Sequence, residues 1–195
     1  MAKTKMDTSL LDRAIIFAVK AHAGTERRGK GFPYIVHPME AMEIVATMTS
    51  DQELLAAAVL HDTVEDTDVT LEQLKDVFGE RVASIVAWES DTYEEGVSEE
   101  DSWHSRKRDA IKRLADAPLE AKIVALGDKL SNMRAIARDY AMQGDNLWNL
   151  FHTKDRKDHE WHYRGLEESL RELKDTYAFK EFEQLIDQVF GNGSH

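Results

Sequence analysis

A seven-residue apolar run, Leu54 to Leu60, leads directly into the polar pair His61-Asp62. Because this run is apolar on all sides, it predicts a helix that is buried at the centre of the fold. A buried charge is costly unless it is paired or coordinates a metal ion. The chain must therefore fold so that other residues meet the polar end of its most central helix.

The rest of the chain predicts an all-α fold. Only three prolines, Pro33, Pro38 and Pro118, interrupt 195 residues that are rich in Ala, Leu, Glu and Lys. Ser50 is expected to cap the buried helix, with Glu53 completing a capping box. Helices are expected over residues 9–23, 37–48, 51–60, 71–78, 81–88, 102–114, 118–140, 157–175 and 178–190. No repeat or linker divides the chain, so residues 1–195 are predicted to form one domain.

Composition excludes several kinds of protein and of site. The 25 basic and 37 acidic residues give a net charge of −12, which argues against a broad surface for a nucleic acid polymer or an anionic membrane. The absence of cysteine excludes disulfides, thiolate metal sites and a thiol nucleophile. No apolar run approaches the roughly 20 residues of a membrane span, and no signal peptide is evident. A cytoplasmic location is expected.

An acidic cluster follows the buried run. Glu65 and Asp66 come four residues after His61 and Asp62, so all four side chains project toward one region if the helix persists. Carboxylates this close repel one another unless protons or a cation neutralise them. A divalent metal would do so. The alternative is an ordinary solvated helix end, but the buried run before the cluster favours a site.

Two further residues repeat this pattern of a polar side chain beside an apolar stretch. His37 stands between an expected extended segment, residues 32–36, and Pro38, whereas Asp128 follows an apolar stretch at 123–126. Asn132 is four residues beyond Asp128 and shares its helical face. Taken alone, His37 is best interpreted as a core or surface histidine whose ring nitrogens are hydrogen-bonded. Asp128 alone is best interpreted as the ion-pair partner of Lys129 or of a nearby arginine.

Together these residues carry a family resemblance. The arrangement His37, His61-Asp62 and Asp128 resembles the signature of the HD metal-dependent phosphohydrolase superfamily. The segments 31–38, 57–67 and 128–132 are similar to the hydrolase domain of the RelA/SpoT family. That resemblance implies a helical bundle that removes the 3′-pyrophosphate from (p)ppGpp, the alarmone of the stringent response, with Mn²⁺. It spans residues 10–140, and residues 141–195 are expected to complete the domain with C-terminal helices.

The resemblance also implies a role for each matching residue. The implied metal ligands are His37, His61, Asp62 and Asp128. The implied catalytic pair, which would orient and deprotonate a water molecule, is Glu65 and Asp66. The implied substrate contacts are Arg27, Arg28, Lys30 and Asn132. A solvated loop is the alternative for the three basic residues, and their exposure predicts that replacing them costs little stability.

The chain also departs from the family pattern. Gly127 stands where alanine is common, and the acidic segment 93–95 stands where a lysine is often found near the substrate phosphates. The triplet 106–108 supplies positive charge there or is a solvated helix face. The pair His159 and His162 fits packing better than a metal site.

The expected protein is a stand-alone enzyme whose partner is a small nucleotide. Guanosine tetraphosphate is the favoured substrate. Other phosphorylated nucleotides such as ppApp or NADPH, a 5′-nucleotidase activity, and a non-catalytic sensor that holds metal and nucleotide are the alternatives. An intact set of ligands together with an intact acidic pair argues against the sensor.

Overall fold

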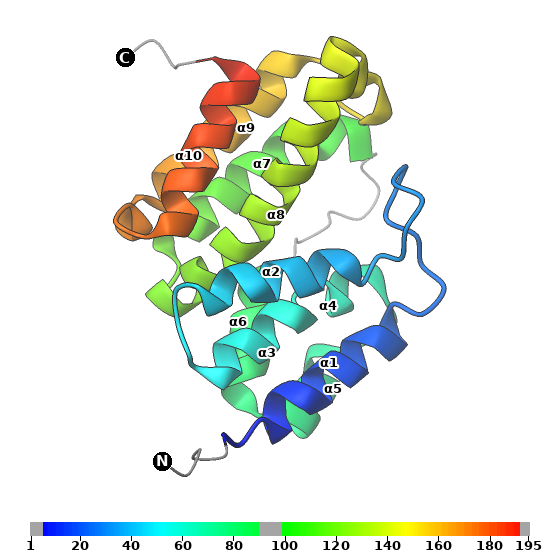
Figure 1. Cartoon of the computed structure of the whole chain (residues 1–195), viewed down its shortest axis with the longest axis vertical. Helices are drawn as coiled ribbons and strands as arrows, with labels where there is room; N and C mark the ends of the chain where they lie inside the picture. Colours follow the sequence, from blue (N-terminus) through cyan, green and yellow to red (C-terminus); the bar gives the residue numbers. More distant parts are fainter. Residues whose placement is uncertain (1–5, 90–98, 192–195) are drawn as a thin grey trace, which may run out of the picture.

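A computed structural model describes residues 6–89 and 99–191 of the chain, so the acidic segment 93–95 lies outside the described residues. Helices follow one another along the described chain (Figure 1). They are α1 (Ser9–Ala21), α2 (Val36–Ala46), α3 (Gln52–Leu60), α4 (Thr63–Asp66), α5 (Leu71–Phe78), α6 (Glu80–Glu89), α7 (Glu99–Asp116), α8 (Leu119–Gln143), the 3₁₀ helix η1 (Gly144–Leu150), α9 (Arg156–Ser169), η2 (Arg171–Leu173) and α10 (Tyr177–Phe190).

The all-α prediction is confirmed. Among residues 6–89 and 99–191 no strand forms, and the extended segment expected at 32–36 contributes only one isolated bridge, from Glu26 to Pro33. The predicted start of the buried helix is wrong by one residue. Asp51 rather than Ser50 caps α3, because the backbone at Asp51 is extended and its side chain accepts a hydrogen bond from the Glu53 amide.

Two apolar clusters form the interior. One joins the C-terminal helices α8, α9 and α10, and the other joins α1, α3, α5 and α6. Helices α2 and α8 belong to both: Ile44 and Leu126 lie in the first cluster, whereas Val45 and Val124 lie in the second. Figure 1 shows the N-terminal helices gathered in one half of the molecule and α7 to α10 in the other. Helices α2, α3 and α8 meet where the two clusters join.

The predicted burial of the run from Leu54 to Leu60 is confirmed, because all seven residues are buried. The helix does not persist through the polar cluster, however. Helix α3 ends at Leu60, and the four-residue α4 begins at Thr63. His61 and Asp62, the two residues between these helices, both keep backbone angles of the right-handed helical region, so the chain continues on a nearly helical course.

Helices α2 and α8 approach each other closely at Gly127. A Cβ atom on Gly127 would lie 2.7 Å from both the Ala41 carbonyl oxygen and Val45 Cγ2, which is closer than such atoms are found in proteins. The departure from the family alanine therefore has a physical cause in this chain. The close approach also places His37 of α2 beside Asp128 of α8.

Candidate metal centre and active site

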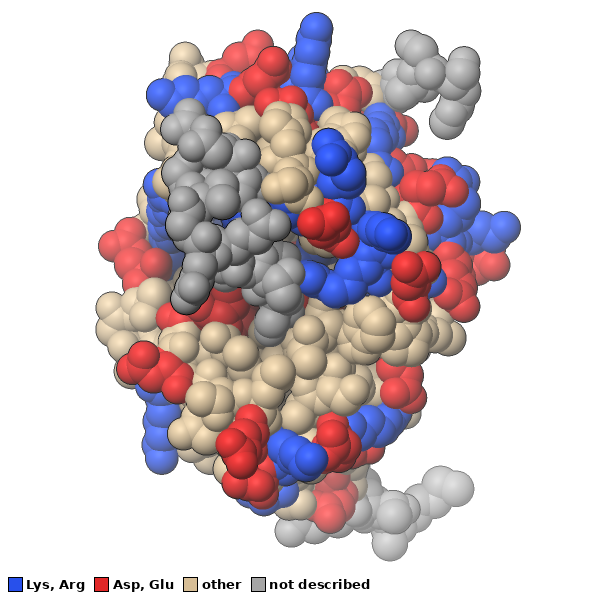
Figure 2. All heavy atoms as spheres, turned by 180° about the vertical axis from the view of Figure 1, so that it is seen from behind, with Lys and Arg blue, Asp and Glu red and all other residues tan. Residues whose placement is uncertain are grey.

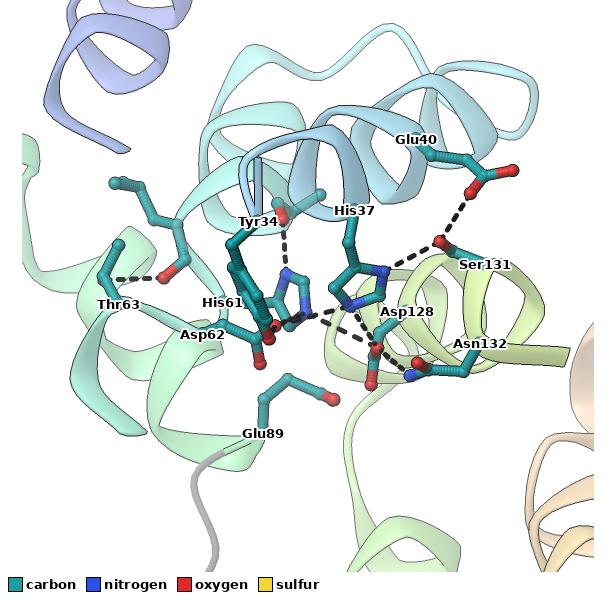
Figure 3. A network of polar contacts seen from close by, with 12 residues as sticks. Tyr34, His37, Glu40, His61, Asp62, Thr63, Glu89, Asp128, Ser131 and Asn132 are labelled. Carbon is teal, nitrogen blue, oxygen red and sulfur yellow. Dashed lines mark hydrogen bonds and ion pairs between the residues drawn. The ribbon is translucent and has the colours of Figure 1, made fainter. Parts of the chain in front are cut away.

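Three of the predicted metal ligands converge although they are up to 91 residues apart in the sequence. His37 lies in the first turn of α2, His61 follows the last residue of α3, and Asp128 lies in the middle of α8. One possible ligand atom from each lies within 4.8 Å of the others, and all three residues are buried. Figure 3 shows their side chains directed at a common point.

Asp62 completes the cluster from the third side. Its Oδ2 atom lies 3.0 Å from His61 Nε2 and 3.4 Å from His37 Nε2. Oδ1 of Asp128 lies 3.1 Å from His37 Nε2 and 3.5 Å from His61 Nε2. Two imidazole nitrogens therefore face two carboxylates across a small buried space.

The second nitrogen of each histidine is fixed from behind. Nδ1 of His61 donates to the Ala58 carbonyl at 2.7 Å. Nδ1 of His37 lies 2.8 Å from Ser131 Oγ, which donates its own proton to Glu40 at 2.8 Å, so Nδ1 is the donor there too. Such partners fix the ring orientation and leave Nε2 for a metal ion. Within the described residues the buried Nε2 of His61 makes no hydrogen bond.

Charge pairing dominates the electrostatics of the cluster. Burial disfavours every charge there, yet the attraction of opposite charges outweighs it. The pKa of Asp62 is held well below its usual range by His61 and His37, and the pKa of Asp128 is lowered in the same way by Lys129 and the histidines. The two carboxylates raise the pKa of His61 well above its usual value.

This donor set suits a divalent cation. Two neutral imidazole nitrogens and two ionised carboxylates are ligands for ions such as Mn²⁺ or Zn²⁺, and the chain contains no cysteine that would select a softer ion. The unsatisfied His61 nitrogen and the two oriented rings fit such an ion. The described residues therefore contain a candidate His37/His61/Asp128 metal centre with Asp62 beside it.

A cavity of about 340 Å³ opens from the cluster. The carboxyl-bearing residues of its wall are Asp62, Glu65, Asp66, Glu89 and Asp128, and the basic ones are Arg27, Lys107, Arg113 and Lys129. The predicted pair Glu65 and Asp66 is exposed on α4 and faces the same cavity as His61. All four polar residues after the buried run therefore line this cavity, although the helix does not persist through them.

The residues predicted to bind substrate separate into two groups. Arg27 and Asn132 line the cavity, and the Arg27 guanidinium donates to Asn132 Oδ1 at 2.5 Å. Asn132 in turn donates to Asp128 Oδ1 at 2.6 Å. Arg28 is exposed and lies 3.2 Å from His152.

Lys30 belongs to neither of these two groups. Its ammonium group pairs with Asp139 of α8, and it does not line the cavity. The expectation that Lys30 is exposed is wrong, because only 18% of its side chain is accessible, and its partner Asp139 is 7% accessible. Removal of the lysine would leave a buried carboxylate without its close partner.

Several contributors to the site carried no clear signal in the sequence. Tyr34 donates to Asp62 Oδ2 at 2.6 Å, and burial raises the pKa of its hydroxyl. Lys129 pairs with Asp128 and lies 3.3 Å from Glu89 at the end of α6. The ion pair weighed for Asp128 therefore exists together with the histidine contacts. The contact of His37 with Glu40 through Ser131 was indicated in the sequence only by the i, i+3 spacing of Glu40 from His37.

The cluster around His159 and His162 is part of the cavity wall. His159 stacks on Trp148 with ring centroids 5.0 Å apart, and its Nε2 lies 2.7 Å from the Thr153 carbonyl. His162 lines the cavity beside Trp103, with ring centroids 6.0 Å apart. The ring stacking and the hydrogen bond of His159 are packing contacts. Of the triplet 106–108, Lys107 alone lines the cavity.

The surface carries both signs of charge. Figure 2 shows Lys and Arg side chains interleaved with Asp and Glu on one face of the molecule, and no continuous basic patch extends across that face. No helix among the described residues is both long enough and apolar enough to cross a lipid bilayer.

The sequence comparisons agree with this geometry. The HD domain model matches residues 14–155. The chain belongs to the HD-domain family. It is 37% identical over 136 residues to the zebrafish (Danio rerio) guanosine-3′,5′-bis(diphosphate) 3′-pyrophosphohydrolase MESH1, covering 67% of this chain and 71% of that relative. It is 36% identical over 131 residues to the guanosine-3′,5′-bis(diphosphate) 3′-pyrophosphohydrolase of Aquifex aeolicus, of whose length the matched region is only 18%.

Two solved structures share the fold of this HD-domain protein. One is a metazoan orthologue of SpoT described as hydrolysing ppGpp, with a TM-score of 0.76, 23% identity and coverage of 97% of this chain and all of that one. The other is lmo0812 from Listeria monocytogenes, with a TM-score of 0.70, 25% identity and coverage of 80% of this chain and 99% of that one. The likeness extends well beyond the residues that form the site.

Proposed function

We propose that this protein is a metal-dependent phosphohydrolase of purine nucleotides, and that its substrate is (p)ppGpp, from which it removes the 3′-pyrophosphate. The whole chain would act as one hydrolase domain, with Mn²⁺ as the favoured metal. The similarity to two guanosine-3′,5′-bis(diphosphate) 3′-pyrophosphohydrolases supports this choice of substrate.

The observation that carries the proposal is the division of charge around the cavity. The buried histidine and aspartate cluster and the acidic pair Glu65 and Asp66 contribute to its wall, together with the cations Arg27, Lys107 and Arg113. A polyphosphate needs both kinds of group, because its charge must be neutralised while one phosphorus atom is presented to water. With a net charge of −12, long-range steering opposes an anionic substrate, so these local cations must supply the affinity.

Each group has a defined part in the proposed reaction. A bound divalent cation, held by His37, His61, Asp62 and Asp128, would polarise a phosphate oxygen and make water a better nucleophile. Glu65 and Asp66 orient the water and accept its proton. The water oxygen forms a bond to the phosphorus that carries the ribose 3′ oxygen, and the bond between that phosphorus and the 3′ oxygen breaks. The acidic pair returns the proton to the 3′ oxygen, which becomes the free hydroxyl of GDP. Pyrophosphate leaves with the oxygen atom of the water.

The nucleoside half of the substrate would lie toward Arg27 and the aromatic wall. The Arg27 guanidinium already lies 5.2 Å from the centroid of the Tyr34 ring, a geometry in which planar groups stack. Asn132 accepts a hydrogen bond from the Arg27 guanidinium and so fixes the orientation of that group. Arg28, which is exposed on the same loop as Arg27, would contact the outer phosphates.

A product assay tests the proposal directly. The Mn²⁺-reconstituted protein is incubated with ppGpp, pppGpp, ppApp, NADPH and deoxynucleoside monophosphates, and the products are identified by mass. The expected result is GDP and pyrophosphate from ppGpp, with turnover lost in Glu65→Gln. Orthophosphate released from the monophosphates would instead show a 5′-nucleotidase. Nucleotide binding without any product would show a sensor and refute the proposal.

A further inference from the structure

The pair formed by Lys30 and Asp139 joins two parts of the chain that the proposed chemistry uses separately. Lys30 lies in the loop between α1 and α2 that carries Arg27, and Asp139 lies in α8, which carries Asp128 and Asn132. Arg138 also approaches Asp139, at 3.9 Å, but 57% of its side chain is accessible to solvent. Lys30 is therefore the main partner of a buried carboxylate.

Backbone hydrogen bonds make the loop a single unit. The Arg27 amide donates to the Phe32 carbonyl at 2.9 Å, and the Tyr34 amide donates to the Thr25 carbonyl at 2.8 Å. The Lys30 amide closes the turn on the Arg27 carbonyl at 2.9 Å. Gly29 and Gly31 both adopt φ of +70°, the left-handed conformation that glycine tolerates best. Arg27 and Lys30 thus stand at the two ends of one tight turn, the blue loop beside α2 in Figure 1.

The spacing on α8 matches this turn. Asn132, which holds Arg27, and Asp139, which holds Lys30, are seven residues apart, so they share one face of α8 about two turns from each other. The loop is attached to α8 at both points. A loop fixed only through Arg27 would lose its place whenever that side chain left Asn132 for a ligand.

We infer that Lys30 and Asp139 are positioning residues, which hold the loop on α8 so that Arg27 stays over the cavity. They touch neither the cavity nor the candidate metal ligands, and they act through Arg27. This inference rests on the proposed function for the identity of the ligand. It revises the expected role of Lys30, from direct contact with the substrate to support of a neighbour that makes the contact.

The first test does not depend on catalysis. Amide hydrogen exchange is measured over residues 25–34 in the wild type, Lys30→Met and Asp139→Asn. Both variants should exchange several-fold faster in this loop while the centre of α8 stays protected. Lys122→Met is the matched control. It also removes a mostly buried lysine, which lies on α8 itself and pairs with Glu172 at 3.1 Å, and it should leave the exchange of the loop unchanged. An unchanged loop in Lys30→Met would overturn the inference.

The second test asks whether the pair acts through Arg27. With the nucleotide that the wild type hydrolyses, Lys30→Met and Asp139→Asn should each raise KM about 3- to 10-fold and change kcat less than about 2-fold. In an Arg27→Ala background the same changes should add less than about 2-fold to KM, because the residue they position is gone. Lys30→Arg, which can still pair with Asp139, should restore most of the affinity.

The outcomes separate the two proposals. If the effects on KM multiply fully in the Arg27→Ala background, Lys30 acts without Arg27 and the inference is wrong. If no nucleotide in the panel is hydrolysed, the proposed function fails, and the exchange experiment still decides whether the pair fixes the loop.

Discussion

Replacement of Gly127 by alanine probes the contact that brings two candidate ligands together. The new Cβ atom would lie 2.7 Å from the Ala41 carbonyl oxygen, where an ordinary contact is 3.4 Å or longer. That oxygen belongs to the backbone of α2, so the helices themselves must move apart by about 0.3–0.7 Å, the difference between 2.7 Å and the range 3.0–3.4 Å. His37 and Asp128, whose facing atoms are 3.1 Å apart, lie on the two helices that separate.

Two opposing contributions set the change in the free energy of unfolding that Gly127→Ala should cause. Alanine is the better helix former by about 1 kcal/mol, whereas overpacking of a buried contact costs about 1–3 kcal/mol. Because the obstacle is backbone, the steric term should win, with a net loss of about 1–2 kcal/mol. For a chain of this size that loss lowers the Tm by about 2–8 °C. The same displacement should weaken divalent metal binding by about 10-fold or more.

Gly165 offers a matched control. It also lies inside a helix, α9, but the three atoms nearest to a Cβ there all belong to the side chain of Ile111, the nearest being Cδ1 at 2.5 Å. A side chain can shift more readily than backbone, so Gly165→Ala should cost less stability than Gly127→Ala. Thermal unfolding followed by circular dichroism and metal titration by calorimetry compare both variants with the wild type. If Gly127→Ala matched Gly165→Ala in Tm and metal affinity, the close α2–α8 contact would not be what holds the site together.

Three further predictions concern the site and its wall. Asp128→Asn should abolish stoichiometric metal binding, whereas Glu65→Gln should keep the metal and lose about 10²–10⁴-fold in turnover; equal metal loss in both, measured by elemental analysis, would contradict the division between ligand and base. Arg27→Ala should raise KM for the nucleotide more than it lowers kcat, because this group holds a part of the substrate that does not react, and an unchanged KM in steady-state assays would exclude it from binding. Burial lowers the pKa of His162 and of His159, so the unfolded chain binds protons that the folded protein does not. Their contribution to the free energy of unfolding should therefore fall as the pH drops from about 7 to 5, opposite in sign to that of His61, whose pKa is raised. The difference between His162→Leu and the wild type isolates the contribution of His162: in urea titrations the variant should lose less stability over this range, and an identical change in both would show that the titration of His162 contributes nothing.

The sequence predicted the helices well because their signals are local. The apolar run Leu54–Leu60 and the short helix expected over 71–78 depend on neighbours within one or two turns, and both are present. The choice between Ser50 and Asp51 as a cap depends on a single backbone angle. Adjacent residues that are both good caps do not reveal that angle, so the prediction was wrong there.

Long-range partners explain what the sequence could not show. The pairing of Lys30 with Asp139 joins residues 109 positions apart, as the difference of the two residue numbers shows. No periodicity marks Asp139 as buried, since a charged residue near the end of a helix is usually solvated. The sequence alone indicated a cation site at His61 and Asp62, but His37 and Asp128 were assigned to it only because family resemblance supplied the long-range information that these residues lie together. The structure adds the partners of the rings, Ser131 and Ala58.

The meeting of two apolar clusters beneath the site has a consequence for how the site comes into being. His61 follows α3, which is packed in one cluster, whereas α8 and α2 belong to both. The N-terminal half contains His37, His61 and Asp62, but Asp128 comes from α8. The ligand set is therefore complete only when the two halves have docked. Cation binding would therefore report the fully assembled population and not a local loop equilibrium. A partly folded chain would bind no metal ion and have no activity. An ion, once bound, would stabilise the docking of the two halves of the molecule.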